Sequence, residues 1–305
     1  MEYLLLIVGF VLLIKGADLF VDGSSSVAKL LKVPSVIIGL TIVSIGTSAP
    51  EAAVSITAGI AGNNEIAVSN IIGSNIFNLL MVIGICAIIK AFASDKDIVK
   101  RDLPINIGVT VILLLMILDG KLGRLDGIIL LVLMIAYIVL LVVNALKNRQ
   151  TGEETKAMSP LKSILFIAIG LFAIILGGDF VVDSSATIAK NFGMSETLVG
   201  LTIVAVGTSL PELVTSIVAA TKGESGLALG NAVGSCIFNI ILILGVSSLL
   251  SPIPVVFESV IDCIVLLGVT VLTYLFSRTS SKTLRWEGIV YVLIYLVYIG
   301  YAIIR

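Results

Sequence analysis

The sequence contains no histidine and little charge. Only 13% of its 305 residues are charged and 58% are hydrophobic, whereas a typical soluble domain carries roughly 25% charged residues. The missing imidazoles exclude His-based zinc sites, His general bases and Ser-His-Asp triads. With a mean hydropathy of +1.18, this composition indicates an integral membrane protein, and we expect it not to be an enzyme.

Cysteine and positive charge are scarce as well. Cys86, Cys236 and Cys263 lie in apolar segments without CxxC spacing, so we interpret them as small buried hydrophobic residues and not as a disulfide framework. A net charge of −1 excludes the basic surface that binds nucleic acid. The expected partners are small ions and the lipid bilayer, with no nucleic acid, no obligate protein partner and no cofactor.

Long apolar runs dominate the chain. A helix needs about 20 apolar residues to cross a bilayer. The start of the chain lacks the positive segment and cleavage motif of a signal peptide, so we expect the first run to remain as a helix. The predicted fold is an all-α polytopic membrane protein with ten transmembrane helices. The predicted spans are 3–22, 36–61, 66–90, 103–119, 125–146, 161–182, 197–221, 226–249, 260–277 and 284–304.

The two halves of the chain repeat one another. Residues 39–84 and 200–245 align without a gap at an offset of 161 positions, and 22 of the 46 pairs are identical. We therefore expect a first five-helix repeat over 1–146, a cytoplasmic linker over 147–160 and a second repeat over 161–305. Because five is odd, the second repeat enters the membrane from the opposite side, so the repeats are predicted to be inverted.

Basic residues predict the orientation of these helices. Of the 19 Lys and Arg residues, only Lys121, Arg124, Lys190 and Arg305 fall on the side opposite the linker, and Lys15 lies within the first span. Cytoplasmic loops carry the excess of Lys and Arg. We expect a cell-membrane protein with both termini outside and the linker in the cytoplasm.

Each repeat interrupts its second helix with a proline beside a carboxylate. Pro50 and Pro211 have no N–H to donate and clash with the preceding turn, so each helix must kink and free backbone carbonyls. Glu51 and Glu212 follow directly. Carboxylates at membrane depth are costly and usually functional. The alternative is a structural pair, but neither glutamate has an obvious Arg or Lys partner on its own helix.

The breaks and the helices that follow them offer oxygen ligands. Ser74 and Asn78 are four residues apart, as are Ser235 and Asn239, which places each pair on one helical face. The alternative is that these residues only hydrogen-bond neighbouring helices. Carboxylate, hydroxyl, amide and carbonyl oxygens suit a hard cation such as calcium. The carbonyls expected to be freed lie around Ser44, Thr47, Ala205 and Thr208.

Four other carboxylates lie near the ends of the first and sixth helices. Asp18 and Asp22 match Asp179 and Asp183 at the same offset of 161, and Lys15 precedes Asp18 by three residues. We favour local pairing or contact with the membrane interface. The alternative is that they line the path by which ions reach the site.

The repeated segments resemble a known family. GTSAPE (46–51) and GTSLPE (207–212), with GSNIFN (73–78) and GSCIFN (234–239), resemble the alpha repeats of the sodium/calcium exchanger family, within the calcium/cation antiporter superfamily, as found in prokaryotic members. The count of five plus five helices fits that family. The resemblance implies a central site that holds calcium or sodium between the two broken helices.

The resemblance also implies roles for individual residues. Glu51 and Glu212 would be the main carboxylate ligands, and Asn78 and Asn239 would complete the centre. The remaining implied ligands are the carbonyls of Thr47 and Thr208, and, for flanking sodium sites, Ser48, Ser74, Ser209 and Ser235 with the carbonyls of Ser44 and Ala205.

One position departs from the family pattern. Several prokaryotic relatives and the potassium-dependent branch carry Asp where this chain has Asn239, so the centre holds two formal negative charges and not three. A calcium ion neutralises two carboxylates fully. We therefore expect transport that is independent of potassium.

The sequence predicts a secondary antiporter that exchanges sodium for calcium by alternating access at a midplane site. A calcium/proton exchanger on the same fold is the first alternative, because burial favours the protonated form of a glutamate; the Ser-rich flanks favour sodium. A passive cation channel is less favoured, because channels more often surround a pore with identical subunits.

Overall fold

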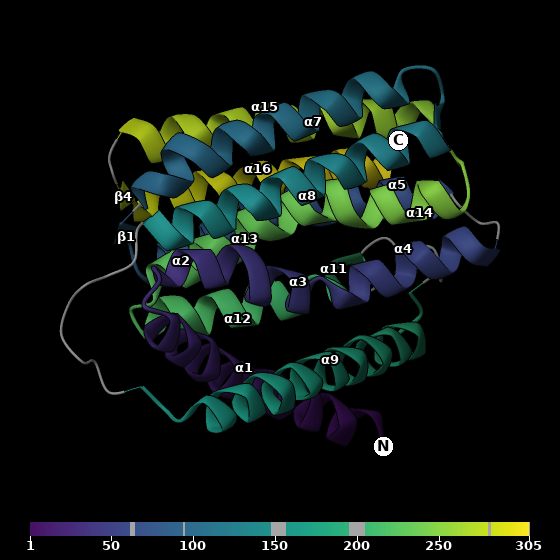
Figure 1. Ribbon diagram of the computed structural model, residues 1–305. Helices are drawn as coiled ribbons and strands as arrows, with labels where there is room; N and C mark the ends of the chain where they lie inside the picture. Colours follow the sequence, from purple (N-terminus) through teal and green to yellow (C-terminus); the bar gives the residue numbers. More distant parts are fainter. Residues whose placement is uncertain (62–64, 94, 148–156, 195–204, 280–281, 305) are drawn as a thin grey trace.

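Almost all of the described chain is helical (Figure 1). The structure, a computed structural model, describes residues 1–305 except 62–64, 94, 148–156, 195–204, 280–281 and 305. Two long helices, α1 (Glu2–Leu31) and α9 (Pro160–Asn191), lie side by side along one face, and the other helices are stacked above them (Figure 1).

The rest of the first half consists of short helical pieces, two long helices and two short strands. Its elements are α2 (Ser35–Ile38), the π-helical η1 (Gly39–Val43), α3 (Ser44–Thr47), α4 (Ala49–Ala61), α5 (Glu65–Phe77), the π-helical η2 (Asn78–Val82), α6 (Ile83–Ile89), β1 (Phe92–Ala93), the π-helical η3 (Ile98–Asp102), α7 (Leu103–Ile117), β2 (Lys121–Leu122) and α8 (Arg124–Lys147).

The second half follows the same order where it is described. Its elements after α9 are α11 (Ala205–Gly207), α12 (Leu210–Thr221), α13 (Ser225–Phe238), the π-helical η5 (Asn239–Leu244), α14 (Gly245–Leu250), β3 (Ile253–Pro254), α15 (Phe257–Thr279), β4 (Lys282–Thr283) and α16 (Arg285–Ile304).

The apolar helices establish a multi-pass membrane protein. In the described part of the chain, seven helices are long and apolar enough to cross a bilayer, and a bent pair over 35–58 makes eight. The predicted span 103–119 corresponds to α7, which has only 15 residues. The predicted span 197–221 begins outside the described residues. Ten transmembrane helices therefore stay a prediction.

Two predicted spans were too short. α1 continues to Leu31 and not to residue 22, and α9 continues to Asn191 and not to residue 182. The polar residues past Asp22 do not interrupt α1, because Ser26 packs against α9, where it accepts a 2.8 Å hydrogen bond from Ser163 Oγ. α1 ends only where Lys32 adopts a left-handed conformation (φ 55°), a common helix terminator.

Glycines let α1 and α9 pack backbone to backbone. A Cβ atom added at Gly9 would lie 2.9 Å from the Gly177 carbonyl oxygen, and one at Gly16 would lie 2.9 Å from that of Gly170. Contacts at Gly9 and Gly16 therefore meet α9 in reverse order, so the two helices are antiparallel. Small residues allow this close approach in membrane proteins, and α1 and α9 form one unit.

Contacts between the halves follow a two-fold rule. β1 pairs with β4, with Phe92 opposite Thr283, and β2 pairs with β3, with Leu122 opposite Ile253. Phe92 and Ile253 are equivalent positions at the offset of 161, and so are Leu122 and Thr283. The pairing of β1 with β4 is therefore equivalent to the pairing of β3 with β2. Such reciprocal contacts are the mark of a two-fold axis. An inverted arrangement relative to the membrane stays a prediction.

The two helices that carry the predicted Ser and Asn ligands lie at the centre of the bundle. In the spans 67–89 and 225–250, 78% of the most apolar window is buried, against 17–39% in the other five spans. α5 with η2 and α13 with η5 are therefore enclosed by protein, and the lipid-facing surface belongs mainly to the outer helices.

Candidate functional site

The first broken helix changes direction at Ser48. α3 ends at Thr47, α4 begins at Ala49, and the two parts of the span meet at 47°. Pro50 occupies the second position of α4, where its missing N–H leaves no hydrogen bond unmade. Glu51 follows it and is fully buried. The first turn of a helix is a favourable place for a carboxylate, because the helix dipole is positive there.

The second broken helix repeats this arrangement. α12 begins at Leu210 after the non-helical Ser209, with Pro211 in its second position and Glu212 in its first turn. Glu212 is also fully buried. α11 begins at Ala205, and the part of the predicted span before it, 197–204, lies outside the described residues.

The Ser44 carbonyl, which was expected to be freed by the break, is engaged by the next turn, and its role as an ion ligand stays a prediction. That carbonyl accepts a hydrogen bond from the Ser48 amide at 3.1 Å, and Ser235 Oγ lies 3.4 Å from it. The reason is the position of Pro50, which removes the amide partner of the residue four positions earlier, Gly46. The Thr47 carbonyl fits the expectation better, since in the described chain no amide of the next turn donates to it.

The serine of each broken helix binds the glutamate of the other. Ser48 Oγ donates to Glu212 Oε1 at 2.8 Å, and Ser209 Oγ donates to Glu51 Oε1 at 2.9 Å. These bonds cross between the halves, so the two breaks meet at one point.

The central helices add a second serine to each glutamate. Ser74 Oγ lies 3.3 Å from Glu51 Oε1, and Ser235 Oγ lies 3.5 Å from Glu212 Oε1. The structure therefore brings four of the predicted serine ligands to the two carboxylates.

Several oxygens at this centre have no hydrogen-bond partner. Within the described structure, Glu51 Oε2, Glu212 Oε2, Asn78 Oδ1 and Asn239 Oδ1 are buried and unpartnered. Buried polar atoms are nearly always paired, so exceptions need an explanation, and a buried charge is especially costly. These four acceptor oxygens suit a hard cation. The amide nitrogen of Asn78 is also unpartnered in the described structure, so both ends of that amide are free to bind. Consistent with two carboxylates among neutral oxygens, no cluster of three acidic or thiol ligands occurs in the described residues.

Both asparagines begin π-helical segments. Asn78 is the first residue of η2, and Asn239 is the first residue of η5. Single π-helical turns inside α-helices are frequent at functional sites. Nothing in the sequence pattern predicts this local widening of the helix.

Sequence reasoning missed Asn231, which joins the two broken helices. Its Nδ2 donates to Ser216 Oγ at 3.0 Å and to the Glu212 carbonyl at 3.3 Å, and its Oδ1 accepts from Thr47 Oγ1 at 2.9 Å. A signal was present, because Ser216 and Asn231 recur as Ser55 and Asn70 in the first half.

Asn75 was missed as well. Its Oδ1 accepts from Asn239 Nδ2 at 3.0 Å, and its Nδ2 donates to the Cys236 carbonyl at 3.0 Å. The duplication gives no signal for it, because Cys236 occupies the matching position. Asn75 holds Asn239 so that its oxygen is left unpaired.

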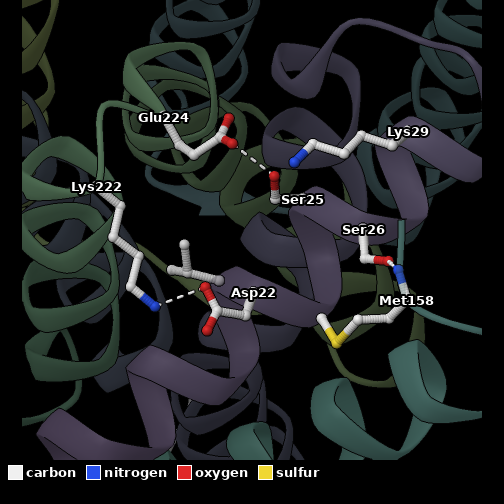
Figure 2. A pocket seen from close by; sticks show the side chains of 8 residues that line it. Asp22, Ser25, Ser26, Lys29, Met158, Lys222 and Glu224 are labelled. Carbon is white, nitrogen blue, oxygen red and sulfur yellow. Dashed lines mark hydrogen bonds and ion pairs between the residues drawn. The ribbon is translucent and has the colours of Figure 1, made fainter. Parts of the chain in front are cut away.

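The two ends of the site differ. Thr47 is fully buried and bound by Asn231. Its counterpart Thr208 has a hydroxyl without a partner in the described structure and lines a cavity of about 460 Å³ with Asp179 and Asp183. At the Thr47 end, charged residues of α1 and of the turn after α12 line a smaller cavity of about 240 Å³ (Figure 2).

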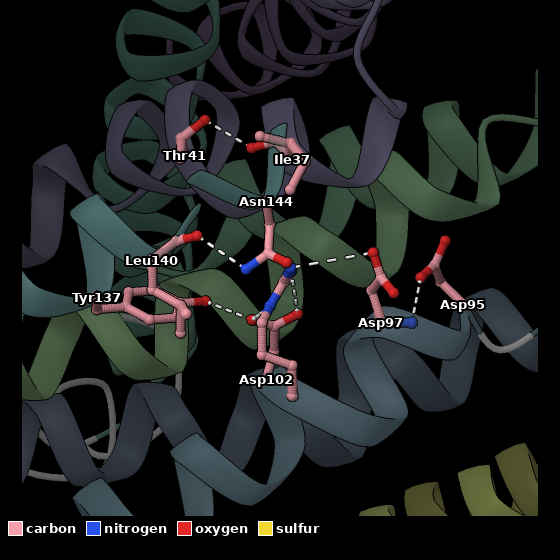
Figure 3. A network of polar contacts seen from close by, with 9 residues as sticks. Ile37, Thr41, Asp95, Asp97, Asp102, Tyr137, Leu140 and Asn144 are labelled. Atoms are coloured by element: carbon pink, nitrogen blue, oxygen red, sulfur yellow. Dashed lines mark hydrogen bonds and ion pairs between the residues drawn. The ribbon is translucent and has the colours of Figure 1, made fainter. Parts of the chain in front are cut away.

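A separate charged cluster lies outside this centre. Asp102 is fully buried and accepts two hydrogen bonds from Arg101, at 2.9 and 2.8 Å, and one from Tyr137 Oη at 3.1 Å (Figure 3). Its carboxylate is therefore fully paired, unlike those of the glutamates. Its counterpart in the second half is Cys263, so the cluster is not duplicated. It fastens η3 to α8 and serves the fold.

Nearly the whole chain matches a known protein family. The match is to the family described as "Sodium/calcium exchanger protein", over residues 1–143 and 162–304. The chain belongs to the sodium/calcium exchanger family. This family member is therefore a transmembrane cation antiporter, and its family is one of transporters and not of enzymes.

Relatives resemble this family member along their full length. The sodium/calcium exchanger MaX1 of Methanosarcina acetivorans is 32% identical over 346 residues, which covers 98% of this chain and 97% of MaX1. The putative antiporter CaxA of Alkalimonas amylolytica is 38% identical over 310 residues, covering 97% and 95%. A structure of the sodium-calcium exchanger NCX_Mj soaked with sodium and strontium superposes with a TM-score of 0.87 at 34% identity, covering 98% and 97%.

Proposed function

We propose that this family member exchanges sodium for calcium across the cell membrane by alternating access, with Glu51 and Glu212 as the carboxylate ligands. The observation that carries the proposal is the set of buried, unpartnered oxygens on these two glutamates and on Asn78 and Asn239. Calcium takes six to eight oxygen ligands in flexible geometry. Sodium and calcium are also the ions for which the exchangers MaX1 and NCX_Mj are named.

The remaining ligands would be neutral oxygens around the two carboxylates. We assign carbonyl oxygens at the breaks and serine hydroxyls to flanking sodium sites, in line with the serine contacts of each glutamate. The proposed set is Thr47, Thr208, Ser48, Ser209, Ser74, Ser235, Ser44 and Ala205.

Competition for the same two carboxylates would couple the two ion flows. One calcium ion or two sodium ions balance the charge of Glu51 and Glu212. Only a site whose charges are balanced can be enclosed in the apolar interior at low free-energy cost. Because one centre cannot hold both loads, exchange follows if the loaded protein switches and the empty one does not. The same count predicts no need for potassium, since Asn239 contributes no charge.

Proton coupling is the second candidate. The observation that favours it is that Glu51 and Glu212 are fully buried and have no ion-pair partner among the described residues. A carboxyl group in such surroundings can exchange a proton in place of a cation.

The test is radioactive calcium uptake into proteoliposomes. Vesicles loaded with sodium are diluted into sodium-free buffer, with and without a pH gradient and with and without potassium, and choline-loaded vesicles serve as the control. We expect uptake that needs internal sodium and is unchanged by potassium. Uptake driven by the pH gradient alone would assign the protein to proton exchange. Flux that needs no counter-ion would indicate a channel.

A further inference from the structure

One lysine connects the α1–α9 unit to the turn after α12 at the Thr47 end of the site. Because Thr47 is fully buried, this end is called the closed end. Lys222 Nζ lies 2.6 Å from Asp22 Oδ1 and 3.3 Å from Asp18 Oδ1, and it donates to the Asp18 carbonyl at 3.1 Å. Figure 2 shows the ammonium group of Lys222 against the Asp22 carboxylate in the lining of the 240 Å³ cavity, where Ser25 also donates to Glu224. These contacts join α1 to the turn between α12 and α13.

The opposite end has the same carboxylates without the lysine. Asp179 and Asp183 are the counterparts of Asp18 and Asp22, but the counterpart of Lys222 is Ala61. Among the described residues, no ion pair involves Asp179 or Asp183, and both line the 460 Å³ cavity beside Thr208. The duplicated sequence therefore carries a cationic tie at one end only, and that end is the one that is closed.

We propose that Lys222, Asp18 and Asp22 form an ionic latch that sets which end of the ion site opens. α12 carries Glu212, and α1 packs against α9 through glycines, so the latch fixes the α1–α9 unit against a helix of the site. While it is closed, the site is reached from the Thr208 end. Opening of the Thr47 end requires Lys222 to release both aspartates.

The latch is expected to have a modest effect on the equilibrium between the two states. Partly exposed ion pairs contribute little each, so two of them bias a two-state equilibrium by about two- to fivefold without locking it. Such a bias suits a transporter, which must visit both states. This inference rests on the proposed alternating access, and it concerns this site's regulation and not its ion selectivity.

The test uses two matched cysteine reporters that require no transport. Val54 lines the open cavity, and Thr215, which is fully buried, is its counterpart at the closed end. Val54→Cys and Thr215→Cys are each labelled with a maleimide in purified protein, against the background of the buried native cysteines. We expect Lys222→Gln to raise the labelling rate at residue 215 and lower it at residue 54, so that the ratio of the two rates changes by about two- to fivefold.

Charge restoration and a neighbouring lysine provide the controls. The double variant Asp22→Lys, Lys222→Asp is expected to return both rates toward those of the parent. Lys15→Gln is expected to change neither, because Lys15 contacts only its own helix neighbour Asp18, at 3.9 Å. High ionic strength set with choline chloride should imitate Lys222→Gln in the parent and add nothing to that variant.

Two different results separate failure of the latch from failure of the proposed function. Equal labelling rates with and without Lys222→Gln, in a protein that still shows sodium-dependent calcium uptake, would overturn the latch alone. Absence of that uptake, with labelling that responds to Lys222→Gln, would retain the latch and reject sodium/calcium exchange.

Discussion

At the scale of the residue, the feature that distinguishes the site is charge without compensation. Asp102 is buried with an arginine and a tyrosine on its carboxylate. Glu51 and Glu212 are equally buried and accept hydrogen bonds from serine hydroxyls, and in the described part of the chain each keeps one oxygen unpartnered. Such a carboxylate costs folding free energy, and the proposed exchange of a bound cation would account for its presence.

Replacing either glutamate by glutamine tests this difference. We expect Glu51→Gln and Glu212→Gln each to lower the initial rate of calcium uptake by at least about tenfold, because each removes half of the charge that balances calcium. Thermal stability without calcium is expected not to fall, since an uncompensated charge is removed. The measurements are proteoliposome uptake and the midpoint of thermal unfolding.

The matched control for both variants is Glu2→Gln. Glu2 also lies in the first turn of a helix but outside the centre, so its replacement should leave uptake unchanged. If both core variants transported calcium normally, the assignment of the site would be wrong.

Asn231 provides a second prediction at this scale. Asn231→Leu leaves the Glu212 carbonyl without its amide donor and Thr47 without a cross-repeat partner. A buried hydrogen-bonding group left unpaired costs about 1–3 kcal/mol, so we expect the apparent KM for calcium to rise by about five- to a hundredfold. Asn144→Leu, at an exposed amide that binds only its own helix, is the control and should leave KM unchanged. A normal KM in Asn231→Leu would limit that residue to packing.

At the scale of the element, helix breaks and helix contacts have separate causes. The breaks follow from Pro50 and Pro211, which a linear pattern reveals. The contact of α1 with α9 follows from glycines seven residues apart on each helix, whose meaning appears only when the helices are placed together. The same sequence also carries glycines without this role, since a Cβ atom added at Gly108 would meet nothing within 4 Å.

This contrast predicts different outcomes for two glycine substitutions. Gly16→Val is expected to lower the thermal unfolding midpoint, because its Cβ would lie 2.9 Å from backbone atoms of Gly170 and Ile174 and overpacking costs about 1–3 kcal/mol. Gly108→Val, in another helix, carries the same change in helix propensity without the clash and should have little effect. Equal unfolding midpoints for the two variants would mean that α1 and α9 can move apart to accommodate the valine at little cost.

At the scale of the whole molecule, the contacts between the halves are symmetric but the two ends of the site are not. The two strand pairings are equivalent when the halves are interchanged. Thr47 and Thr208 are not, because Thr47 is fully buried and Thr208 lines a cavity. A carrier with alternating access needs both properties, a symmetric scaffold and an asymmetric state. Under the proposed alternating access, the structure corresponds to the state in which the Thr208 end is open.

The direction of that opening depends on orientation, which labelling of intact cells can measure. Lys121 and Lys147 are both exposed and lie at opposite ends of the segment formed by β2 and α8. The distribution of basic residues predicts that Lys121→Cys reacts with an impermeant maleimide in intact cells and that Lys147→Cys reacts only after permeabilisation. The converse result would invert the topology and place the Lys222 latch outside.

The sequence by itself determined the family and the membrane class, and it predicts the residues at the core of the proposed site. Absent histidine, the apolar runs and the repeated GTS-x-PE and GS-x-IFN segments are local or periodic features, and such features survive in a one-dimensional pattern. The prolines located the breaks, and the duplication paired Glu51 with Glu212 before any coordinates were considered.

Only the tertiary structure decided which oxygens remain unpaired, which carbonyls are engaged and which end of the site is closed. Asn75, Asn231 and the latch lysine act on partners more than 160 positions away, and no spacing rule reaches that far. The motifs around the two glutamates are nearly identical in the two copies, so the sequence describes both ends of the site alike. A folded conformation can open only one end of the site at a time. Here the closed end is the one that has Lys222, whose counterpart in the first half is Ala61.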